Sequence, residues 1–207
     1  MEEIAKYVIV KSYKRNECIL LEGKMNRQFC IIKKGKIKIS CSDRNGKEVI
    51  FALLGEGDFF GEMSIIDKDH CSATVTCMQA CKIYCMKDIY FKRLLTKVPG
   101  LAYHLLNHMS RRLRCSNRCI ENLNCRNSLH RVGSVLLDLA EYSGYRYKKS
   151  VIIKKIPFQH DIAAIAGISR ETVSRSFSQL EEGNYIKKSG RHLVITDYPR
   201  FYNIFSS

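Results

Sequence analysis

The stretch from Phe158 to Gly183, FQHDIAAIAGISRETVSRSFSQLEEG, constrains the fold more than any other part of the sequence. Small and apolar residues lie on one face of a first short helix: Ile162, Ala163, Ile165 and Ala166. Gly167 permits a left-handed turn, and Ser169 is placed to cap a second helix that has Glu171 in its first turn. Two short helices joined by a glycine-containing turn predict a helix-turn-helix, whose second helix fits the major groove of DNA.

The second helix is expected to have one buried and one polar face. The predicted buried residues are Ile168, Val173, Phe177 and Leu180, and the predicted outward residues are Arg170, Glu171, Ser174 and Arg175. Arginine bonds guanine O6 and N7 bidentately, and a carboxylate accepts a hydrogen bond from cytosine N4. This polar edge therefore favours readout of base pairs. The residues alone also fit a helical hairpin whose outer charges are only solvated.

The same string resembles the recognition helix of the Crp/Fnr family of regulators. Residues 169–173, SRETV, resemble one branch of that family, and the pattern Glu171-x-x-Ser174-Arg175 resembles its anaerobic branch. The resemblance implies a set of DNA-contacting residues: Gln159, Ser169, Arg170, Glu171, Thr172, Ser174 and Arg175. It also implies a bacterial homodimer on a palindromic double-stranded operator, with RNA polymerase as a further partner.

Charge points to the same class of partner. The chain of 207 residues has 35 Lys and Arg against 20 Asp and Glu, a net charge of +15. Such an excess favours a polyanionic partner and salt-dependent binding, although a solvated basic surface would give the same count. No apolar run approaches the roughly 18 residues of a membrane span, and the N-terminus lacks a signal-peptide pattern. We therefore expect a cytoplasmic protein with reduced thiols and no membrane partner.

Residues 1 to about 97 read as short strands separated by glycines. The strand-like runs are Cys18–Leu21, Phe29–Lys33, Lys36–Ser40, Glu48–Leu54, Ala73–Cys77 and Lys82–Met86. Asn45-Gly46 between two of these runs is a strong signal for a two-residue hairpin. Many short strands of this kind predict an antiparallel roll or jelly roll. An amphipathic stretch from Lys87 to Thr96 predicts a helix that Pro99 stops or restarts.

Residues 57–64, GDFFGEMS, followed by Ser72, form a second notable motif. A glycine-punctuated turn before a short helix offers free backbone amides to an anion, or is only a tight connection. The motif resembles the phosphate-binding cassette of the cyclic-nucleotide fold. The resemblance implies effector contacts from Gly61, Glu62, Met63, Cys71 and Ser72, with Glu62 on the ribose hydroxyl and Ser72 on the phosphate.

The cassette departs from the family pattern at Cys71, which stands where the family has an arginine, and it is one residue short. A thiol does not replace the bidentate, charge-assisted bond that arginine makes to phosphate. Losing such a donor costs on the order of 1.5–3 kcal/mol or more. We therefore expect an effector other than cyclic AMP.

Residues 99–127 carry a heptad pattern. Apolar and small residues recur with alternating spacings of four and three: Ala102, Leu106, Met109, Leu113, Ser116, Ile120 and Leu123. Such a seam favours a coiled coil between two subunits, whose interface would contain Leu106, Met109, Leu113, Ser116, Ile120 and Leu123. One long helix packed on its own domain would show a related pattern. The resemblance implies that the helix dimerises and that Ser116 and Asn117 contact the effector.

The sensing chemistry stays open at this point. Cys115, Cys119 and Cys125 on the long helix fit an iron–sulfur cluster, a thiol redox switch or inert thiols. Haem is another candidate, with an axial ligand from His104, His108 or His130. A small-molecule effector needs none of these groups.

The remaining C-terminal segments complete a winged helix-turn-helix. Residues 130–144 predict a helix ending at a glycine, and Lys148–Ile156 is a β-rich stretch. Tyr185–Lys188 and His192–Thr196 predict a hairpin, the wing, where Lys187, Lys188 and Arg191 face phosphates. The tail from Tyr198 to Ser207 shows no motif.

The sequence therefore predicts an α+β protein with an N-terminal antiparallel β-roll, a long dimerisation helix and a C-terminal winged helix-turn-helix. Residues 1–127 form the effector-sensing domain with the helix, and residues 128–207 form the DNA-binding domain. The predicted function is effector- or redox-controlled transcription regulation. A nucleotide-binding module whose basic helices bind protein or RNA is the alternative. No P-loop, HExxH or paired-carboxylate motif indicates an enzyme.

Overall fold

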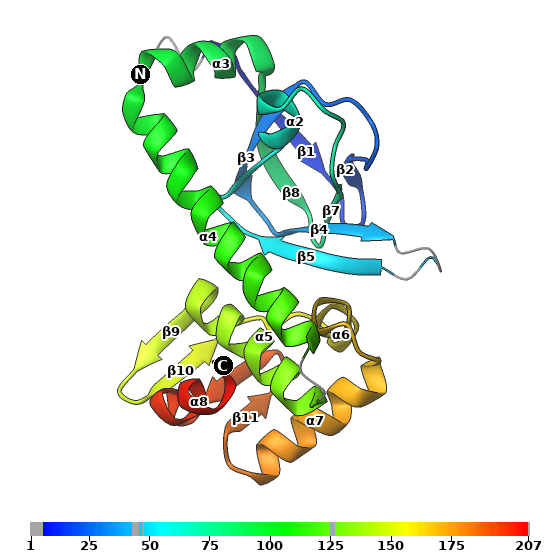
Figure 1. Cartoon of the computed structure of the whole chain (residues 1–207), viewed down its shortest axis with the longest axis vertical. Coiled ribbons are helices and arrows are strands. Elements are labelled where there is room, and N and C mark those ends of the chain that lie inside the picture. The colour runs from blue at the N-terminus through cyan, green and yellow to red at the C-terminus, as the bar shows by residue number, and fades with distance from the viewer. Residues whose placement is uncertain (1–5, 43–45, 47, 125–126, 207) are drawn as a thin grey trace. The chain divides into compact units, whose positions relative to one another are not determined.

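The structure, a computed structural model, describes residues 6–42, 46, 48–124 and 127–206, and leaves the side chains of residues 115 and 118–124 undescribed. The chain divides into two compact units, Met1–Ser110 and Arg111–Ser207. Figure 1 shows both, with the strands of the first unit in blue to teal and the second unit in green to red. The boundary falls inside one long helix.

The first unit is a roll of two four-stranded antiparallel sheets. One sheet has the order β1 (Val8–Tyr13), β8 (Cys81–Lys87), β3 (Gln28–Lys34) and β6 (Phe59–Phe60). The other has the order β2 (Cys18–Leu20), β7 (Thr74–Cys77), β4 (Ile37–Ser42) and β5 (Glu48–Leu54). Their buried faces share one apolar cluster that includes Ile32, Ile37, Phe60 and Ile83. The predicted antiparallel roll is confirmed.

The six predicted strands are all present, within about two residues of the expected ends. The predicted pairing of the two runs that flank Asn45-Gly46 is confirmed by β4 and β5. Ser42 lies opposite Glu48, so five residues connect the strands and the predicted two-residue connection is wrong. Asn45 itself lies outside the described residues, and Gly46 has φ 77°. Two strands, β1 and β6, were not predicted. A short helix, α2 (Met63–Ile66), follows β6 as expected.

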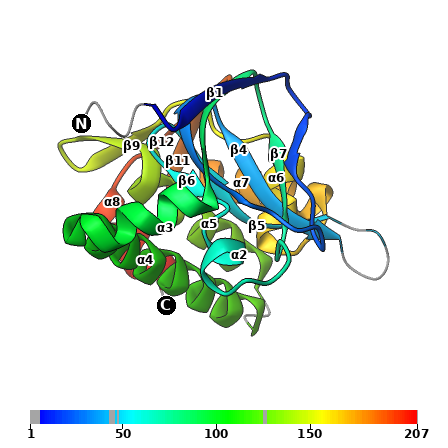
Figure 2. The ribbon, with the colours of Figure 1, turned by 90° about the horizontal axis from the view of Figure 1, so that it is seen from above.

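Two helices close the first unit. Helix α3 spans Asp88–Lys97, and α4 (Pro99–Asn124) begins at Pro99, so the proline restarts the helix. Figure 2 shows α3 and the start of α4 beside the roll. Leu105 is buried with Phe29, Phe59 and Phe91, and Met109 packs against this cluster. The first turns of α4 therefore contact their own roll as well as presenting an outer face.

The outer face of α4 has exposed apolar residues at predicted interface positions. Leu106 is 62% exposed and Leu113 is 63% exposed. Ser116 is exposed, whereas the side chains of Ile120 and Leu123 lie outside the described residues. Exposed leucines at heptad spacing are consistent with a partner helix, which stays a prediction.

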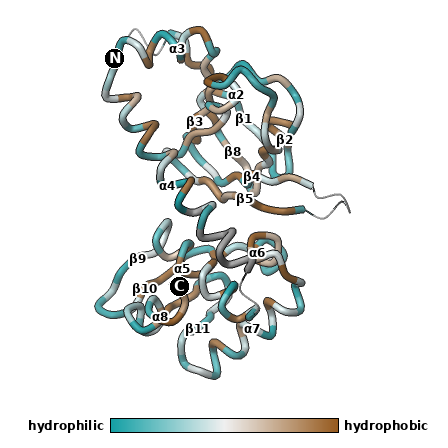
Figure 3. Tube along the Cα trace, in the orientation of Figure 1, coloured by the Kyte–Doolittle hydropathy of each residue, from teal (hydrophilic) through white to brown (hydrophobic). Residues whose placement is uncertain are grey.

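The second unit surrounds α5, which spans Ser128–Ser143 and begins at the Asn127 cap. Its other elements are β9 (Gly144–Tyr147), β10 (Ser150–Ile153), α6 (Gln159–Ala166), α7 (Arg170–Glu182), β11 (Ile186–Ser189), β12 (His192–Ile195) and α8 (Tyr198–Phe205). The sheet order is β11-β12-β10-β9. Apolar segments, brown in Figure 3, mark α5 and α8, whose Leu136, Phe201 and Phe205 share the core with Leu180 of α7.

The predicted β-rich stretch Lys148–Ile156 contains β10. It pairs with β9, a strand that was not predicted, in a hairpin whose turn includes Lys148 at φ 52°. The tail, in which we found no motif, forms α8. The Asp197 side chain caps this helix by accepting a hydrogen bond from the Arg200 backbone N–H, and Phe201 is buried. The wing hairpin of β11 and β12 is confirmed.

Among the described residues, no helix combines the length and apolar character needed to cross a bilayer.

Candidate functional site

The helix-turn-helix forms as predicted. Gly167 ends α6 in the left-handed region at φ 66°, where a side chain would add strain. Ser169 caps α7: its Oγ accepts a hydrogen bond from the Thr172 backbone N–H at 3.2 Å. Val173, Phe177 and Leu180 are buried in the core of the unit, and Ile168 packs against that core. Burial of this face fixes which side of α7 remains outside.

The remaining face of α7 carries the predicted reading residues. Arg170, Glu171, Ser174 and Arg175 are all exposed. The Nη2 of Arg175 donates a hydrogen bond to Thr172 Oγ1 at 3.4 Å. Hydrogen bonds from its own backbone N–H and from the Ser169 side chain lower the pKa of the Glu171 carboxyl, with Arg170 and Arg175 adding to the effect. Glu171 is therefore charged at neutral pH and accepts hydrogen bonds only.

The cap of α7 leads to a first prediction. Ser169→Ala removes the side chain that satisfies the Thr172 N–H, so the unfolding free energy is expected to fall by about 1 kcal/mol. Ser178→Ala is the matched control, because Ser178 is an exposed serine inside the same helix that bonds only the Ser174 carbonyl. Urea denaturation followed by circular dichroism measures both. Equal losses in the two variants would contradict the role of the cap.

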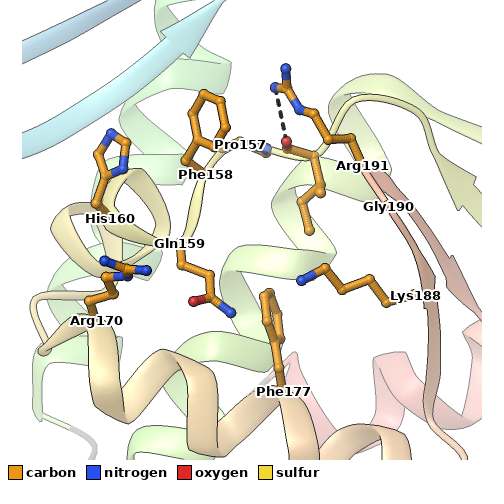
Figure 4. Close-up of a pocket in the computed structure, with 10 residues that line it drawn as sticks. Pro157, Phe158, Gln159, His160, Arg170, Phe177, Lys188, Gly190 and Arg191 are labelled. Carbon is orange, nitrogen blue, oxygen red and sulfur yellow. Dashed lines mark hydrogen bonds between the residues drawn. The ribbon is translucent and has the colours of Figure 1, made fainter.

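A cleft of about 350 Å³ lies between α6, α7 and the wing (Figure 4). Arg191 from the wing donates to the Ile156 carbonyl at 3.2 Å, and its guanidinium lies 4.6 Å from the centre of the Phe158 ring. Lys188 lies 5.5 Å from the centre of the Phe177 ring. In the view of Figure 4, the Gln159 amide lies between Arg170 and Lys188. The structure thus brings together predicted residues that are up to 32 positions apart in sequence, from Gln159 to Arg191.

The residues that line the cleft favour the binding of an anion. Arg170, Lys188 and Arg191 line it, and none of its ten described lining residues is acidic. Phe158 and His160, whose rings stack at 5.6 Å, also line it, and we did not predict either. The sequence feature that could have identified them is their position on either side of Gln159, at the start of α6. Cations beside aromatic rings and an amide suit the phosphates of a nucleic acid backbone.

Five of the predicted effector residues come together around α2: Gly61, Glu62, Met63, Cys71 and Ser72. The other two, Ser116 and Asn117, lie on α4. Gly61 has φ 81°, and its carbonyl accepts a hydrogen bond from Asn26 Nδ2 at 3.0 Å. The same Nδ2 lies 3.3 Å from Ser64 Oγ. Glu62 is 2% exposed, and Ser72 Oγ lies 4.0 Å from Met63 Sδ. Asn26 was not predicted, since no local pattern links it to this motif.

Cys71 is buried beside this cluster. Burial raises the pKa of the Cys71 thiol, against a smaller lowering by a hydrogen bond with Ser64. The side chain is therefore a neutral thiol at neutral pH. It brings no positive charge to the position where the family pattern has arginine.

The remaining sensor candidates are only partly described. His104 is exposed, the ring of His108 lies 5.1 Å from Phe59, and His130 Nε2 donates to the Ile204 carbonyl at 2.9 Å. Cys125 and the side chains of Cys115 and Cys119 lie outside the described residues. The described part of the chain shows no group of three or more His, Cys, Asp or Glu suited to a metal.

Two family models match the chain. Residues 10–97 match the cyclic nucleotide-binding domain, and residues 130–204 match the Crp-like helix-turn-helix domain. The whole of α4 lies between the two matches.

Curated relatives match over nearly the whole chain. The sequence is 28% identical over 196 residues to the cAMP-activated global transcriptional regulator CRP of Salmonella typhimurium, covering 94% of this chain and 93% of that protein. It is 27% identical over 188 residues to the CRP-like cAMP-activated global transcriptional regulator of Mycobacterium tuberculosis, covering 91% of this chain and 84% of that protein.

Solved structures share the fold. FixK2 from Bradyrhizobium japonicum is similar with a TM-score of 0.83 at 21% identity, covering 97% of this chain and 98% of that one. A CooA mutant from Carboxydothermus hydrogenoformans gives a TM-score of 0.85 at 18% identity, covering 99% of this chain and 90% of that one.

Proposed function

Because the chain belongs to the Crp/Fnr family of DNA-binding transcription regulators, we propose that it acts as a homodimer on a palindromic operator. Residues 1–127 would sense the signal and residues 128–207 would bind DNA, with RNA polymerase as a further partner. The observation that carries this proposal is the exposed polar edge of α7, held outward by the burial of Val173, Phe177 and Leu180. Two such helices related by a two-fold axis fit half-sites about one DNA turn apart.

The contacts divide into two classes. Arg170, Glu171, Ser174 and Arg175 supply the donors and acceptors that distinguish bases in the major groove. Gln159, Lys188 and Arg191 line the basic cleft beside them and bind the backbone. In this proposal the cleft sets the position of α7, and the polar edge of α7 supplies the sequence preference.

Competition binding tests the proposal. The protein is mixed with a labelled palindrome containing TGTGA-like or TTGA-like half-sites and challenged with the unlabelled palindrome or with scrambled DNA of equal length. We expect the palindrome to compete at concentrations at least about 10³-fold lower than the scrambled DNA. Equal competition by both DNAs would refute sequence-specific regulation and favour a basic module that binds RNA or protein.

The sensed signal is proposed to be a small molecule other than cyclic AMP. The relatives named above are cAMP-activated. In this chain Glu62 and Ser72 retain the cassette positions, whereas Cys71 is a neutral thiol that gives phosphate no charge-assisted partner. The effector would instead use the bonded pair Asn26 and Ser64, together with Ser72, whose hydroxyl lies beside Met63 of α2.

Thermal unfolding provides the second prediction. A ligand that binds only the folded protein raises the unfolding free energy by about 2.7 kcal/mol at one hundred times its Kd, and Tm rises with it. We expect millimolar cyclic AMP to leave Tm unchanged. Cys71→Arg is the matched variant, since it returns the cationic donor, and it is expected to gain a cyclic AMP-dependent rise in Tm. A saturable rise in the unmodified protein would contradict the proposal.

A further inference from the structure

Two buried thiols lie opposite each other across neighbouring strands of the roll. Cys30 on β3 and Cys85 on β8 are direct register partners, and their Sγ atoms are 3.6 Å apart. Cys30 is 1% exposed and Cys85 is 3% exposed, so both side chains are held within the core. The paired strands fix both backbones, and rotation of the two side chains sets the distance between the sulfur atoms.

The pair lies beside a small cavity that contains a cation. A cavity of about 150 Å³ is lined by Cys85, Lys11, Gln28, Met86 and Tyr90 among others. Lys11 Nζ donates a hydrogen bond to Gln28 Oε1 at 3.1 Å, which holds the ammonium at this place. A water molecule takes about 30 Å³ of liquid volume, so a small hydroperoxide fits the cavity.

The two thiols differ in their readiness to ionise. The hydrogen bond from Cys30 lowers the pKa of Cys85, opposed by burial and assisted by the charge of Lys11. The same hydrogen bond, with burial, raises the pKa of Cys30. Cys85 also lines the cavity beside Lys11, whereas Cys30 does not, so Cys85 is placed to act as the nucleophile and Cys30 as the neighbouring thiol.

We propose that Cys85 and Cys30 form a dithiol site that reduces a small hydroperoxide and closes to a disulfide. The Cys85 thiolate attacks the terminal peroxide oxygen, the O–O bond breaks, and the alkoxide takes a proton to leave as an alcohol, or as water from hydrogen peroxide. Cys85 is then a sulfenic acid. The Cys30 sulfur attacks it, the S–O bond breaks, and the departing hydroxide takes the Cys30 proton to leave as water. The two thiols lose two electrons, and the peroxide gains them.

The pairing of β3 with β8 is compatible with a disulfide between Cys30 and Cys85. A disulfide needs an S–S distance of about 2.05 Å and a Cα separation between about 4.4 and 6.8 Å. Residues directly opposite in an antiparallel pair have Cα separations of about 4.5–5.5 Å, inside that range. The sulfurs must approach by about 1.5 Å, which side-chain rotation and a small strand shift provide.

Cys77 and Cys81 form a natural comparison within the same core. Both are buried, and burial raises the pKa of Cys77 to about 12, with a hydrogen bond involving Cys81 adding to the effect. Cys81 Sγ also donates to the Gln79 carbonyl at 3.2 Å. Neither residue lines the cavity that contains Lys11. This second pair is expected to stay reduced under conditions that oxidise the first.

The experiment treats the fully reduced, full-length protein with stoichiometric hydrogen peroxide, followed by alkylation and peptide mass spectrometry. We expect a disulfide between Cys30 and Cys85, with Cys77 and Cys81 alkylated. In Cys30→Ala, Cys85 is expected to carry one added oxygen that dimedone traps. In Lys11→Met, disulfide formation is expected to slow by about tenfold or more.

The unmodified protein alone decides the central point, so the inference does not depend on how well the variants fold. Alkylation of Cys30 and Cys85 at the same rate before and after peroxide would overturn the proposal, as would oxidation that appears first at Cys77 or Cys81. The inference does not rest on the proposed DNA-binding function, because its readout is thiol chemistry and not operator affinity.

Discussion

Substitution Leu113→Glu is expected to make the protein monomeric and to weaken operator binding by about 100-fold, or about 2.7 kcal/mol. Leu113 is 63% exposed in the single chain, so glutamate there is tolerated by the monomer. In a two-fold helix pair the same position faces its counterpart or a neighbouring seam residue. Two carboxylates would then lose water and repel each other. Sedimentation velocity and fluorescence anisotropy with labelled operator measure the two effects.

Phe51→Glu is the matched control. Phe51 is an apolar residue of β5 that is 54% exposed and lies outside the proposed interface. This variant is expected to remain dimeric and to bind operator as the unmodified protein does. A dimeric Leu113→Glu protein with full operator affinity would show that α4 does not pair subunits through this face.

Arg175→Ala is expected to remove about 1–3 kcal/mol of discrimination at one base pair of each half-site. Arg175 is exposed on the outer face of α7, and its guanidinium makes a 3.4 Å hydrogen bond with Thr172 Oγ1, which DNA readily replaces. The guanidinium is needed for bidentate hydrogen bonds to guanine. Without it, the four possible base pairs at the contacted position are expected to give nearly equal binding affinity. Binding to operators that carry every single substitution in one half-site measures the change.

Lys188→Ala separates base reading from backbone binding. Lys188 lines the basic cleft beside α7, where we assign it to phosphate contact. Its loss is expected to weaken binding to all sequences uniformly and to reduce the slope of log K against log salt by about one. A uniform loss for Arg175→Ala as well would make Arg175 a phosphate contact and remove it from base recognition.

Much of the fold follows from local patterns in the sequence. Glycine-separated β-rich runs marked most strands of the roll, and Asn45-Gly46 indicated that the two runs beside it pair, as β4 and β5 do. Gly167 predicted the end of α6, and Ser169 predicted the start of α7, each to within a residue. These signals depend on backbone geometry that only a few residue types supply, so they survive without tertiary information.

The missed elements lacked such signals or were misread. β6 has only two residues, too short to show a period, and β1 alternates poorly because it is an edge strand with an exposed Ile9 and Val10. α8 did carry a signal: the Asp197 cap is followed by aromatic residues at helical spacing, including the buried Phe201 and Phe205.

The candidate site was predicted in its parts but not in its assembly. The reading residues of α7 follow from helix periodicity, since burying Val173 and Phe177 exposes Arg175. The cleft forms only because the wing folds back beside α6. No periodic pattern in the sequence predicts the contacts of Arg191 with Ile156 and Phe158. The same is true of Cys30 and Cys85, which lie 55 residues apart and meet only through sheet register.

Photo-cross-linking from α7 tests the central claim most directly. A benzophenone amino acid replaces Ser174 on the exposed edge, and the protein is irradiated on a palindromic operator. The account predicts cross-links to bases at two positions related by the operator's two-fold axis, about one DNA turn apart. Cross-links that are absent, or that appear equally along scrambled DNA, would contradict it.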